Sequence, residues 1–396
     1  MHAQRIIQDF LAEKCQSIHA KRRQCLAAFT DAAQHGGLGL LKMSKVVQSE
    51  TTLRHRIKRC DRLLSNSHLD QERPEIYRAL TRCVLEHQRQ VGIIVDWSDL
   101  LPDTSQHVLR ASVVAQGRAI VIYEEVHPGK VYGAAAIHRK FMEALRTMLP
   151  VACEPVIITD AGFRAAWFKM LDELGFAWIG RIRNRDKVRP GNTGSWSGCK
   201  ELYPSATGRP RDLGHFEYVR SNPVACRLVI IRKAPKGRKD KNAFGKSTRS
   251  QRSNKQRAGQ REPWLLAVSR NLSRLSAKTI VAWYGHRMQI EQTFRDLKCA
   301  QWGMGLETSQ TRQPKRLAAL LLIAALLGLA LWLIGLAARK IGYRVQYGSK
   351  KKATSTLSIL SLARHWIRDN TSKLLSRRQL DEALVELKSM LAVYKI

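Results

Sequence analysis

The residues best placed to do chemistry lie between positions 284 and 298. Tyr284, Arg287, Glu291 and Lys298 stand at offsets of 0, 3, 7 and 14 residues. At 100° per residue of an α-helix, these side chains fall within about 60° of one another and form one polar stripe. The adjacent stripe is apolar and consists of Trp283, Ile290, Phe294 and Leu297. The pattern predicts a helix over residues 276–298 that packs on a sheet and presents its polar edge to a site.

Two aspartates follow short apolar runs. Asp96 comes after Val-Gly-Ile-Ile-Val and Asp160 after Pro-Val-Ile-Ile-Thr, and both runs are typical of buried strands. Carboxylates in such places are costly unless they share a cation, and Glu291 offers a third acid. Oxygen ligands without Cys or His suit two Mg²⁺ ions, with Mn²⁺ as a substitute. We therefore predict a metal site from these three acids. Asp99 is the alternative to Asp96, but its position suits a strand end less well.

Charge and composition indicate the partner of this site. Lys and Arg number 68 against 32 Asp and Glu, a net charge of +36 on 396 residues, while 44% of the residues are hydrophobic. A folded chain with this self-repulsion gains binding free energy from a polyanion, because neutralised phosphates release condensed counterions. Nucleic acid is therefore the expected partner, with an anionic membrane surface as the alternative. With paired metal ions, the expected reaction is cleavage or transfer of a DNA phosphodiester.

Other patterns argue against several classes of protein. The eight cysteines are scattered, with no C-x-x-C pair, so neither a zinc site nor a disulfide framework is expected. The first 30 residues lack the apolar stretch of a secretory signal, which favours a cytoplasmic protein. Residues 317–338 carry no charge and are long enough to span a bilayer. Positive charge on both flanks, together with Gly328 and Gly335, favours a buried helix instead.

The first 85 or so residues indicate short helices with little strand character. Within residues 43–65, apolar residues recur with helical spacing at Leu53, Ile57, Cys60 and Leu64. The opposite side of this helix is basic, with Arg54, Lys58 and Arg62, and beside them Arg56 and Arg59. A second short helical stretch precedes it, so we expect a helix-turn-helix-like reader of DNA. The alternative is a charged face that is merely solvated.

Strand patterns begin near residue 88. Two β-rich runs within residues 108–126 flank a Gln116-Gly117 turn and predict a hairpin. After Asp160, a helix and a further strand follow, and such alternation indicates an α/β layer architecture. Paired Glu124 and Glu125 are expected to be surface charge. His138 and His286 lack partner spacing, and no role is assigned to them.

Two further segments complete the chain. Residues 232–261 contain twelve Lys or Arg against one Asp, and they are expected to form a basic arm that orders on a phosphate backbone. A solvating linker is the alternative. The C-terminal helix has a leucine stripe at alternating spacings of four and three, formed by Leu380, Leu384, Leu387 and Leu391. Such a stripe serves ordinary helix packing or, alternatively, a dimer seam.

Three motifs together resemble the DDE transposases of insertion-sequence family four. They are Val95-Asp96-Trp97-Ser98-Asp99, Thr159-Asp160-Ala161-Gly162-Phe163 and the signature Tyr284-x2-Arg287-x3-Glu291-x6-Lys298. The resemblance continues through Met288-Gln289-Ile290-Glu291 and Phe294-Arg295-Asp296-Leu297-Lys298 and covers essentially the whole chain. One strand that ends in Asp is weak support, whereas the four-residue signature in register with two upstream aspartates is highly specific.

The resemblance implies an α/β fold with an RNase H-like catalytic core. A β-rich insertion at residues 184–263 interrupts this core, which spans residues 88–338. It is flanked by an α-helical DNA-end-binding domain at residues 1–87 and by an α-helical C-terminal region at residues 339–396, where dimerisation is expected. In this family a buried helix follows the catalytic helix, so the apolar segment is expected to be buried and no membrane partner is expected.

The resemblance also implies an activity. In this family a metal-activated water nicks one strand, and the freed 3′-hydroxyl attacks the opposite strand to form a hairpin on the element end. A second water reopens the hairpin, and the same site joins the ends to target DNA. The expected protein is thus a Mg²⁺-dependent transposase that acts as a homodimer on double-stranded inverted-repeat ends, in a bacterial cytoplasm at the nucleoid. The alternative is a non-catalytic DNA-end-binding or inhibitory relative.

Matching positions carry the family's roles onto single residues. The metals are bound by Asp96, Asp160 and Glu291. Phosphates near the cut are contacted by Tyr284, Arg287 and Lys298. Apart from the resemblance, Arg181 at the end of the strand after Asp160 is a candidate DNA-backbone contact, and the basic helix is expected to bind the element end through Arg54, Lys58, Arg59 and Arg62. Trp264 matches an aromatic residue that stacks on a flipped base, although an ordinary core aromatic is the alternative.

Overall fold

Two compact units make up the computed structural model of the chain. Unit 1 consists of Met1–Cys153 and Met288–Lys395, and unit 2 is Glu154–Arg287. These units cut across the domain boundaries that the sequence predicts at residues 87 and 338. The structure describes residues 2–183, 186–191, 194–234, 262–301, 303–343, 357–370 and 374–392. The predicted basic arm lies outside the described residues from position 235 onward.

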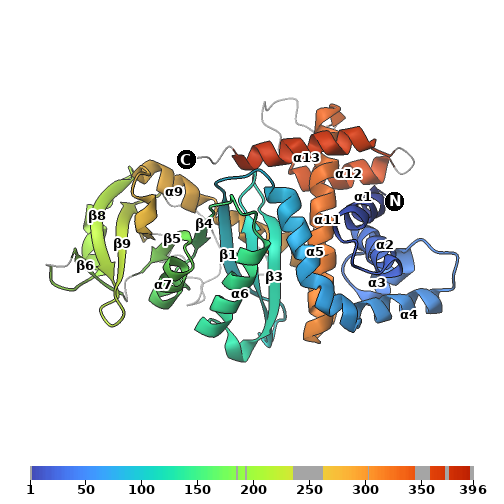
Figure 1. Cartoon of the computed structure of the whole chain (residues 1–396), viewed down its shortest axis with the longest axis horizontal. Coiled ribbons are helices and arrows are strands. Elements are labelled where there is room, and N and C mark those ends of the chain that lie inside the picture. Colours follow the sequence, from blue (N-terminus) through green and yellow to red (C-terminus); the bar gives the residue numbers. More distant parts are fainter. Residues whose placement is uncertain are drawn as a thin grey trace, which may run out of the picture. The chain divides into compact units, whose positions relative to one another are not determined.

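Unit 1 contains an antiparallel sheet with the strand order β3-β2-β1. Its strands are β1 (Gly92–Asp99), β2 (Gln106–Val113) and β3 (Ile120–Pro128). Gly117 has a φ of 77° in the turn between β2 and β3, a value that favours glycine, and the predicted hairpin is confirmed. Helix α6 (Ala135–Met148), which the sequence analysis did not predict, lies beside these strands in Figure 1, and its Phe141 stacks on Tyr123 of β3.

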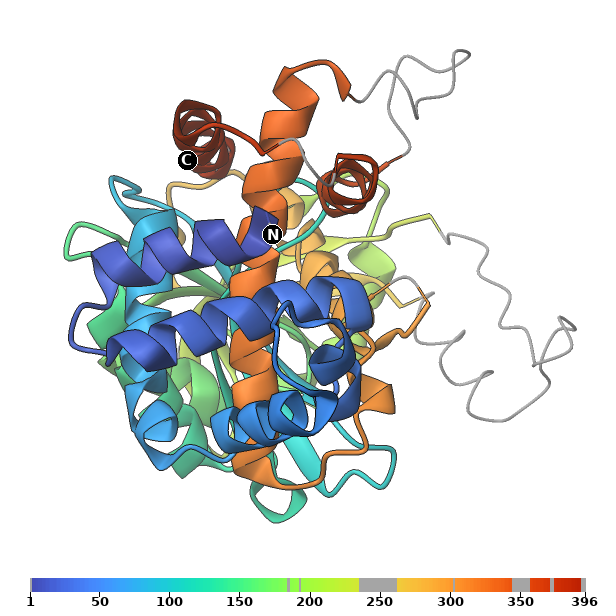
Figure 2. The same ribbon diagram turned by 90° about the vertical axis from the view of Figure 1, so that its right-hand side faces the viewer.

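Helices form most of the other described residues of unit 1. The N-terminal ones are α1 (His2–Lys14), α2 (Ala20–Gly36), α3 (Leu40–Val46), α4 (Leu53–Leu64) and α5 (Ser67–Leu85). The short helical stretch and the basic helix expected within residues 43–65 are thus α3 and α4, which pack on each other. Figure 2 shows α1 and α2 side by side across the long helix α11 (Pro314–Lys340).

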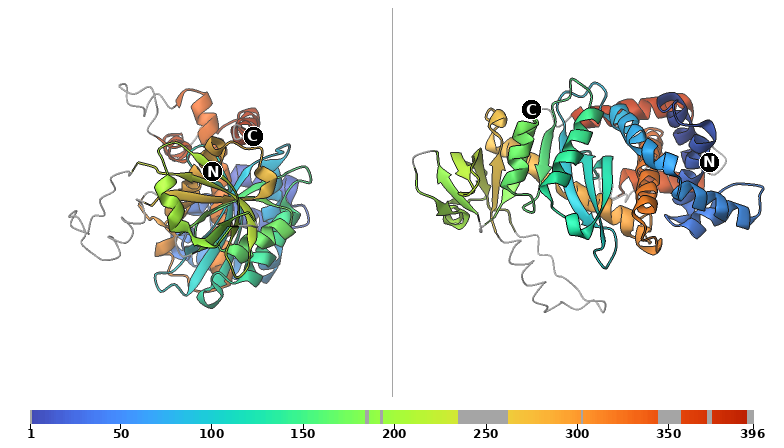
Figure 3. Two further views of the ribbon diagram at one scale, coloured as in Figure 1. Left: turned by 90° about the vertical axis from the view of Figure 1, so that its left-hand side faces the viewer. Right: turned by 60° about the horizontal axis from the view of Figure 1, so that its bottom comes forward.

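Helix α11 is the centre of unit 1. It packs against α2, α5, β3, α12 (Ile359–Asp369) and α13 (Arg377–Ala392), as the right panel of Figure 3 shows. By length and composition α11 could cross a membrane, but 94% of its most apolar window is buried inside the structure. The prediction of a buried helix is therefore confirmed. In the leucine stripe of α13, Leu387 and Leu391 are buried, which agrees with helix packing.

The described residues of unit 2 form seven strands in the order β4-β5-β10-β9-β8-β6-β7. Its strands are β4 (Val156–Thr159), β5 (Ala177–Ile182), β6 (Lys187–Pro190), β7 (Ser197–Gly198), β8 (Arg211–Tyr218), β9 (Val224–Ile231) and β10 (Trp264–Val268). The pair β4–β5 is parallel and the other pairs are antiparallel. Strands β6 to β9 fall within the predicted insertion. Helices α7 (Ala165–Glu173) and α9 (Ala277–Gly285) both pack on β5 and β9 (Figure 1).

The single helix predicted over residues 276–298 is wrong. Two helices occupy this stretch, α9 in unit 2 and α10 (Met288–Lys298) in unit 1. Beyond Gly285, the amides of His286 and Arg287 bond three residues back, to the carbonyls of Trp283 and Tyr284, so the α-helical pattern ends there. Periodicity does not register this break, because the side-chain spacing stays nearly helical through the turn.

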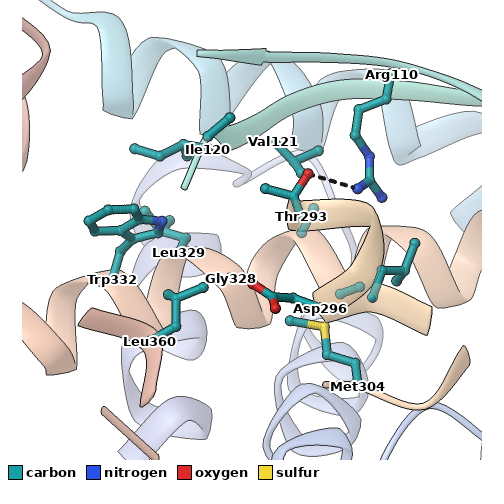
Figure 4. A pocket seen from close by; sticks show the side chains of 14 residues that line it. Arg110, Ile120, Val121, Thr293, Asp296, Met304, Gly328, Leu329, Trp332 and Leu360 are labelled. Carbon is teal, nitrogen blue, oxygen red and sulfur yellow. Dashed lines mark hydrogen bonds between the residues drawn. The ribbon is translucent and has the colours of Figure 1, made fainter. Parts of the chain in front are cut away.

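The two glycines of α11 differ in their surroundings. A Cβ at Gly335 would lie 2.2 Å from the carbonyl oxygen of Ile359 in α12, so this glycine permits the close packing that the sequence predicts. A Cβ at Gly328 would meet nothing within 4 Å. Gly328 instead lines a cavity of about 50 Å³ together with Asp296, Met304 and Trp332 (Figure 4).

The surroundings of these two glycines predict that replacement by alanine has opposite effects on stability at the two positions. Gly335→Ala should lower the free energy of unfolding by about 1–3 kcal/mol, because α12 must move away. Gly328→Ala should raise it by about 0.5–1 kcal/mol, because alanine favours the helix and the added methyl enters the cavity. Chemical denaturation of both variants measures the difference. Equal effects of the two substitutions would contradict this packing.

Candidate functional site

Asp96 lies where the buried part of β1 ends. The strand is buried from Gly92 to Val95, half-buried at Asp96 and exposed at Asp99. Asp96 is therefore inside the strand and not at its end, which corrects the sequence prediction. One of its carboxylate oxygens accepts a hydrogen bond of 2.9 Å from the amide of Trp97. The alternative acid, Asp99, is 57% exposed at its side chain and pairs with His107 at 2.9 Å.

Helix α10 carries Glu291 and is anchored at four points along its length within unit 1. Near its N-terminus, the side-chain amide of Gln289 accepts a 3.0 Å hydrogen bond from the amide of Ala115 and donates a 2.6 Å one to the carbonyl of the same residue. The other three anchors are Thr293 to Arg110, Asp296 to Arg118 and Lys298 to Ser98. Glu291 itself is half-buried. The sequence analysis did not single out Gln289 as a positioning residue.

Lys298 forms the last of these anchors. Its ammonium donates a 2.8 Å hydrogen bond to the hydroxyl of Ser98. Ser98 is two residues after Asp96, so both side chains extend from the same face of β1. Burial lowers the pKa of Lys298, and the carboxylate of Asp99 partly counteracts this. A partly desolvated cation thus lies on the face of β1 that carries Asp96.

An ion pair is buried on that same face of the sheet. The strand register places Arg110 of β2 opposite both Asp96 of β1 and Glu124 of β3. Arg110 and Glu124 are each 2% exposed, and the guanidinium donates hydrogen bonds of 2.6 and 2.7 Å to one carboxylate oxygen. Tyr77 of α5 donates to the other oxygen at 3.1 Å. Phe294 of α10 lies under the guanidinium, 4.6 Å away.

Glu124 corrects the expectation of surface charge. Burial raises its pKa, while Arg110 and Tyr77 stabilise the ionised form and lower it. The neighbouring Glu125 is half-buried and bonds to Tyr123 and His127. The sequence did contain a signal for the buried pair, because Arg110 and Glu124 are each seven residues from Gly117. A hairpin centred on that turn brings them opposite each other.

Asp160 is one of the predicted site residues in unit 2. It directly follows β4 and is half-buried. Its carboxylate accepts a 2.8 Å hydrogen bond from the amide of Gly162, which fixes a tight turn. A Cβ at Gly162 would lie 2.9 Å from that carboxylate oxygen, so a side chain there would crowd the turn. The predicted placement of Asp160 after a buried strand is confirmed.

Tyr284 and Arg181 face each other across α9 and β5. Tyr284 is 4% exposed, and burial raises its pKa, which nearby Arg287 and Arg181 counteract. Arg181 points toward the α9 side of the sheet, whereas the adjacent Gly180 contacts α7, because successive strand residues point to opposite faces. Arg181 makes long hydrogen bonds of 3.4 and 3.5 Å to the carbonyls of residues 263 and 262. Burial lowers the pKa of Arg181.

Trp264 begins β10 and is half-buried. Its ring meets the edge of the Tyr284 ring, with centroids 5.0 Å apart at 77°. The ammonium of Lys233 lies 4.5 Å from the Trp264 ring centroid. The indole is therefore only partly buried, and it has a cation and a phenol as neighbours.

Helix α4 presents most of its predicted basic face to solvent. Arg54, Lys58 and Arg62 are exposed. Arg59 turns inward, with its guanidinium 5.7 Å from the ring of Phe29 in α2. Arg56 donates hydrogen bonds to two backbone carbonyls at the end of α3 and so holds the turn between the two helices. The described structure thus separates three surface cations from two that stabilise the helical unit.

The donor chemistry of the three acids suits Mg²⁺. Asp96 and Glu291 belong to unit 1 and Asp160 to unit 2. All three are half-buried carboxylates, which supply the hard oxygen ligands that Mg²⁺ prefers. Within the part of the chain that the structure describes, no three His, Cys, Asp or Glu side chains gather into a metal site. Metal binding by this set therefore remains a proposal.

Comparison with known proteins gives one finding about family. The model of a family described as the transposase DDE domain matches residues 87–327. This range includes all three acids as well as Arg181, Trp264 and the full Tyr284-to-Lys298 signature. No curated protein shows a significant match to the chain.

The buried ion pair predicts that the effects of substitutions at its residues on the free energy of unfolding do not add. Arg110→Met should lower the free energy of unfolding by about 3–5 kcal/mol, because it leaves Glu124 charged and uncompensated. The triple variant Arg110→Met/Glu124→Leu/Tyr77→Phe should recover most of this loss, because no buried polar group is then left unpaired. Chemical denaturation measures both. A triple variant no more stable than Arg110→Met would show that the pair is not the cause.

Proposed function

The chain belongs to the transposase DDE domain family, and we propose that it moves its own insertion sequence by a cut-and-paste route. Family membership identifies an enzyme that acts on DNA and implies an RNase H-like core. The proposal is carried by the Tyr284, Arg287, Glu291 and Lys298 signature in register with Asp96 and Asp160. It is further supported by the anchoring of α10, which fixes the helix that carries Glu291.

The proposed site uses the three carboxylates as metal ligands. Asp96, Asp160 and Glu291 would hold two Mg²⁺ ions, with Mn²⁺ as a substitute. Bound ions of this kind stabilise the attacking and the leaving oxygen of an in-line displacement at phosphorus. The acids are half-buried, which limits competition by bulk water while leaving the ligand oxygens within reach of a phosphate.

Basic and aromatic residues would position the DNA. Lys298 and Arg287 would bind phosphates beside the cut, with Tyr284 donating a hydrogen bond, because burial keeps its hydroxyl protonated. Arg181 would serve as a further backbone contact. Trp264 would stack on a base that leaves the helix during formation and reopening of the hairpin, before the 3′ ends are joined to target DNA.

The remaining finer assignments are also proposals. The exposed Arg54, Lys58 and Arg62 of α4 would bind the double-stranded inverted-repeat ends, while the inward-turned Arg59 stabilises the helix that presents them, and a homodimer would hold two ends together. The runs at residues 288–291 and 294–298 support placement in insertion-sequence family four, near the cut-and-paste transposase of a bacterial tetracycline-resistance transposon. Such a protein would act in the cytoplasm, at the nucleoid.

Cleavage of a labelled element end tests the catalytic assignment. With Mg²⁺ present, Asp96→Asn, Asp160→Asn and Glu291→Gln should each reduce the cleavage rate by more than about 100-fold, since even the outer partners of metal ligands are worth 10- to 100-fold. Binding of the end in a gel-shift assay should persist. Asp99→Asn is the matched control and should cut like the wild type, because Asp99 is exposed and pairs with His107.

Two outcomes would contradict this function. If the wild type binds ends but leaves them uncut with Mg²⁺ and with Mn²⁺, the chain is a non-catalytic relative. If the substituted proteins cut as fast as the wild type, the three acids are not the metal ligands.

Gln289 gives a second test, of positioning. Gln289→Met keeps the size of the side chain but leaves the buried amide and carbonyl of Ala115 without this partner, so α10 should lose its first anchor. We expect the cleavage rate at saturating DNA to fall about 10- to 100-fold with little change in end affinity. Gln292→Met, on the same helix, is the control. A change in affinity alone would contradict a positioning role.

A further inference from the structure

An aromatic cluster surrounds Trp97, the residue after Asp96. Four rings contribute: His107 of β2, His127 of β3, Tyr132 after β3 and His138 of α6. Their centroids lie 6.4, 5.6, 5.1 and 5.9 Å from that of Trp97, in that order. All five residues belong to unit 1. None of them has a role in the function proposed above.

The indole of Trp97 is held in place by a hydrogen bond. Its N–H donates to the Nε2 atom of His138 at 2.9 Å. His138 is 7% exposed, and burial together with nearby His127 lowers its pKa to about 4. The imidazole is therefore neutral near pH 7 and able to accept this bond. Trp97 is only half-buried, so part of a fixed aromatic ring remains at the surface.

Tyr132 extends the aromatic surface outward. It follows the short helix Gly129–Val131, and 55% of it is exposed. Its ring is tilted by 48° to that of Trp97 and lies 4.8 Å from His107. A single exposed tyrosine is ordinary, but here the exposed ring continues a cluster whose other members are anchored.

Metal binding is not the use of the three histidines. His107 lies 2.9 Å from the carboxylate of Asp99 as an ion-pair partner, His127 bonds to Glu125 at 2.8 Å, and His138 accepts a hydrogen bond from the indole of Trp97. Each ring thus has its own partner, and no group of metal-ligating side chains forms among the described residues. These bonds orient the rings around Trp97 instead.

Charge and position indicate what the surface binds. Lys130, Arg139 and Lys140, on the same segment and the start of α6, are exposed. Exposed aromatic rings beside basic residues are the combination that binds unstacked bases, with cations on the backbone and a ring under the base. The cluster also lies on the half-buried part of β1 that follows Val95, and this part includes Asp96.

We propose that Trp97 and Tyr132 form a stacking platform for an unpaired DNA base near the Asp96 site, on the opposite face of β1. This inference rests on the proposed function, because it requires DNA at the Asp96 site. Asp96 and Trp97 are consecutive residues, and their Cα atoms are about 3.8 Å apart. The side chains of Asp96 and Trp97 point to opposite faces of β1, so stacking does not displace a metal ligand.

Two matched DNA probes test the platform with the full chain. Both carry the same terminal inverted repeat; one is fully paired, and the other ends in a short single-stranded extension. The background is Glu291→Gln, so that neither probe is cut. The readout is the ratio of the two dissociation constants by fluorescence anisotropy. The platform predicts tighter binding of the extended probe.

Variants separate stacking from charge and from folding. Tyr132→Ala and Trp97→Leu should weaken binding of the extended probe about 5- to 150-fold and leave the paired probe unchanged. Tyr132→Phe should retain the preference, because the ring remains. Lys130→Ala should weaken both probes alike, as a phosphate contact does. Tyr132 is exposed at the surface, so its truncation tests the platform without removing a core residue.

The outcomes distinguish this inference from the proposed function. Loss of the preference in Tyr132→Ala, with retention in Tyr132→Phe, supports the platform. If the Glu291→Gln protein binds both probes with equal affinity, the platform is overturned while DNA-end binding stands. The same holds if Tyr132→Ala and Trp97→Leu leave the ratio of the two dissociation constants unchanged. If the parent binds neither probe, the proposed function fails as well.

Discussion

The buried pair of Arg110 and Glu124 is the interaction on which unit 1 depends. Two charges taken out of water cost several kcal/mol each, and only close geometry with further hydrogen bonds compensates for that cost. Here the compensation comes from three other elements: the register of the hairpin, Tyr77 of α5, and the Thr293 and Phe294 side chains of α10. The pair therefore specifies where two helices and three strands meet, and α10 carries Glu291.

The second constraint is the apolar helix α11. Helices α2, α5, α12 and α13 pack around it, and none of the residues that α11 buries is charged. Ion pairs tie the ends of this helix to its neighbours, through Arg316 to Asp61 and Arg339 to Glu386. A strongly basic protein can in this way keep a compact fold and still attract DNA.

Much of the fold could be predicted from the sequence where a buried face gives a helix or strand a clear pattern of apolar residues. The hairpin, the strands before Asp96 and Asp160, and the buried α11 were predicted because apolar runs and a Gly turn leave few alternatives. The break at residues 286–287 was missed because local hydrogen bonds changed while side-chain spacing did not. Glu124 and Gln289 were missed because burial of a polar residue depends on partners 14 and 174 residues away.

Strand β1 shows how one short segment serves two roles. Because side chains alternate, Asp96 and Ser98 extend toward α10, where Lys298 bonds to Ser98, while Trp97 and Asp99 extend toward α6 and the histidines. Asp96 is thus kept on one face of β1, and an aromatic surface is built on the other. A shift of one residue in register would exchange the two faces. Such a shift of β1 would place Val95 or Trp97 opposite Arg110 in place of Asp96.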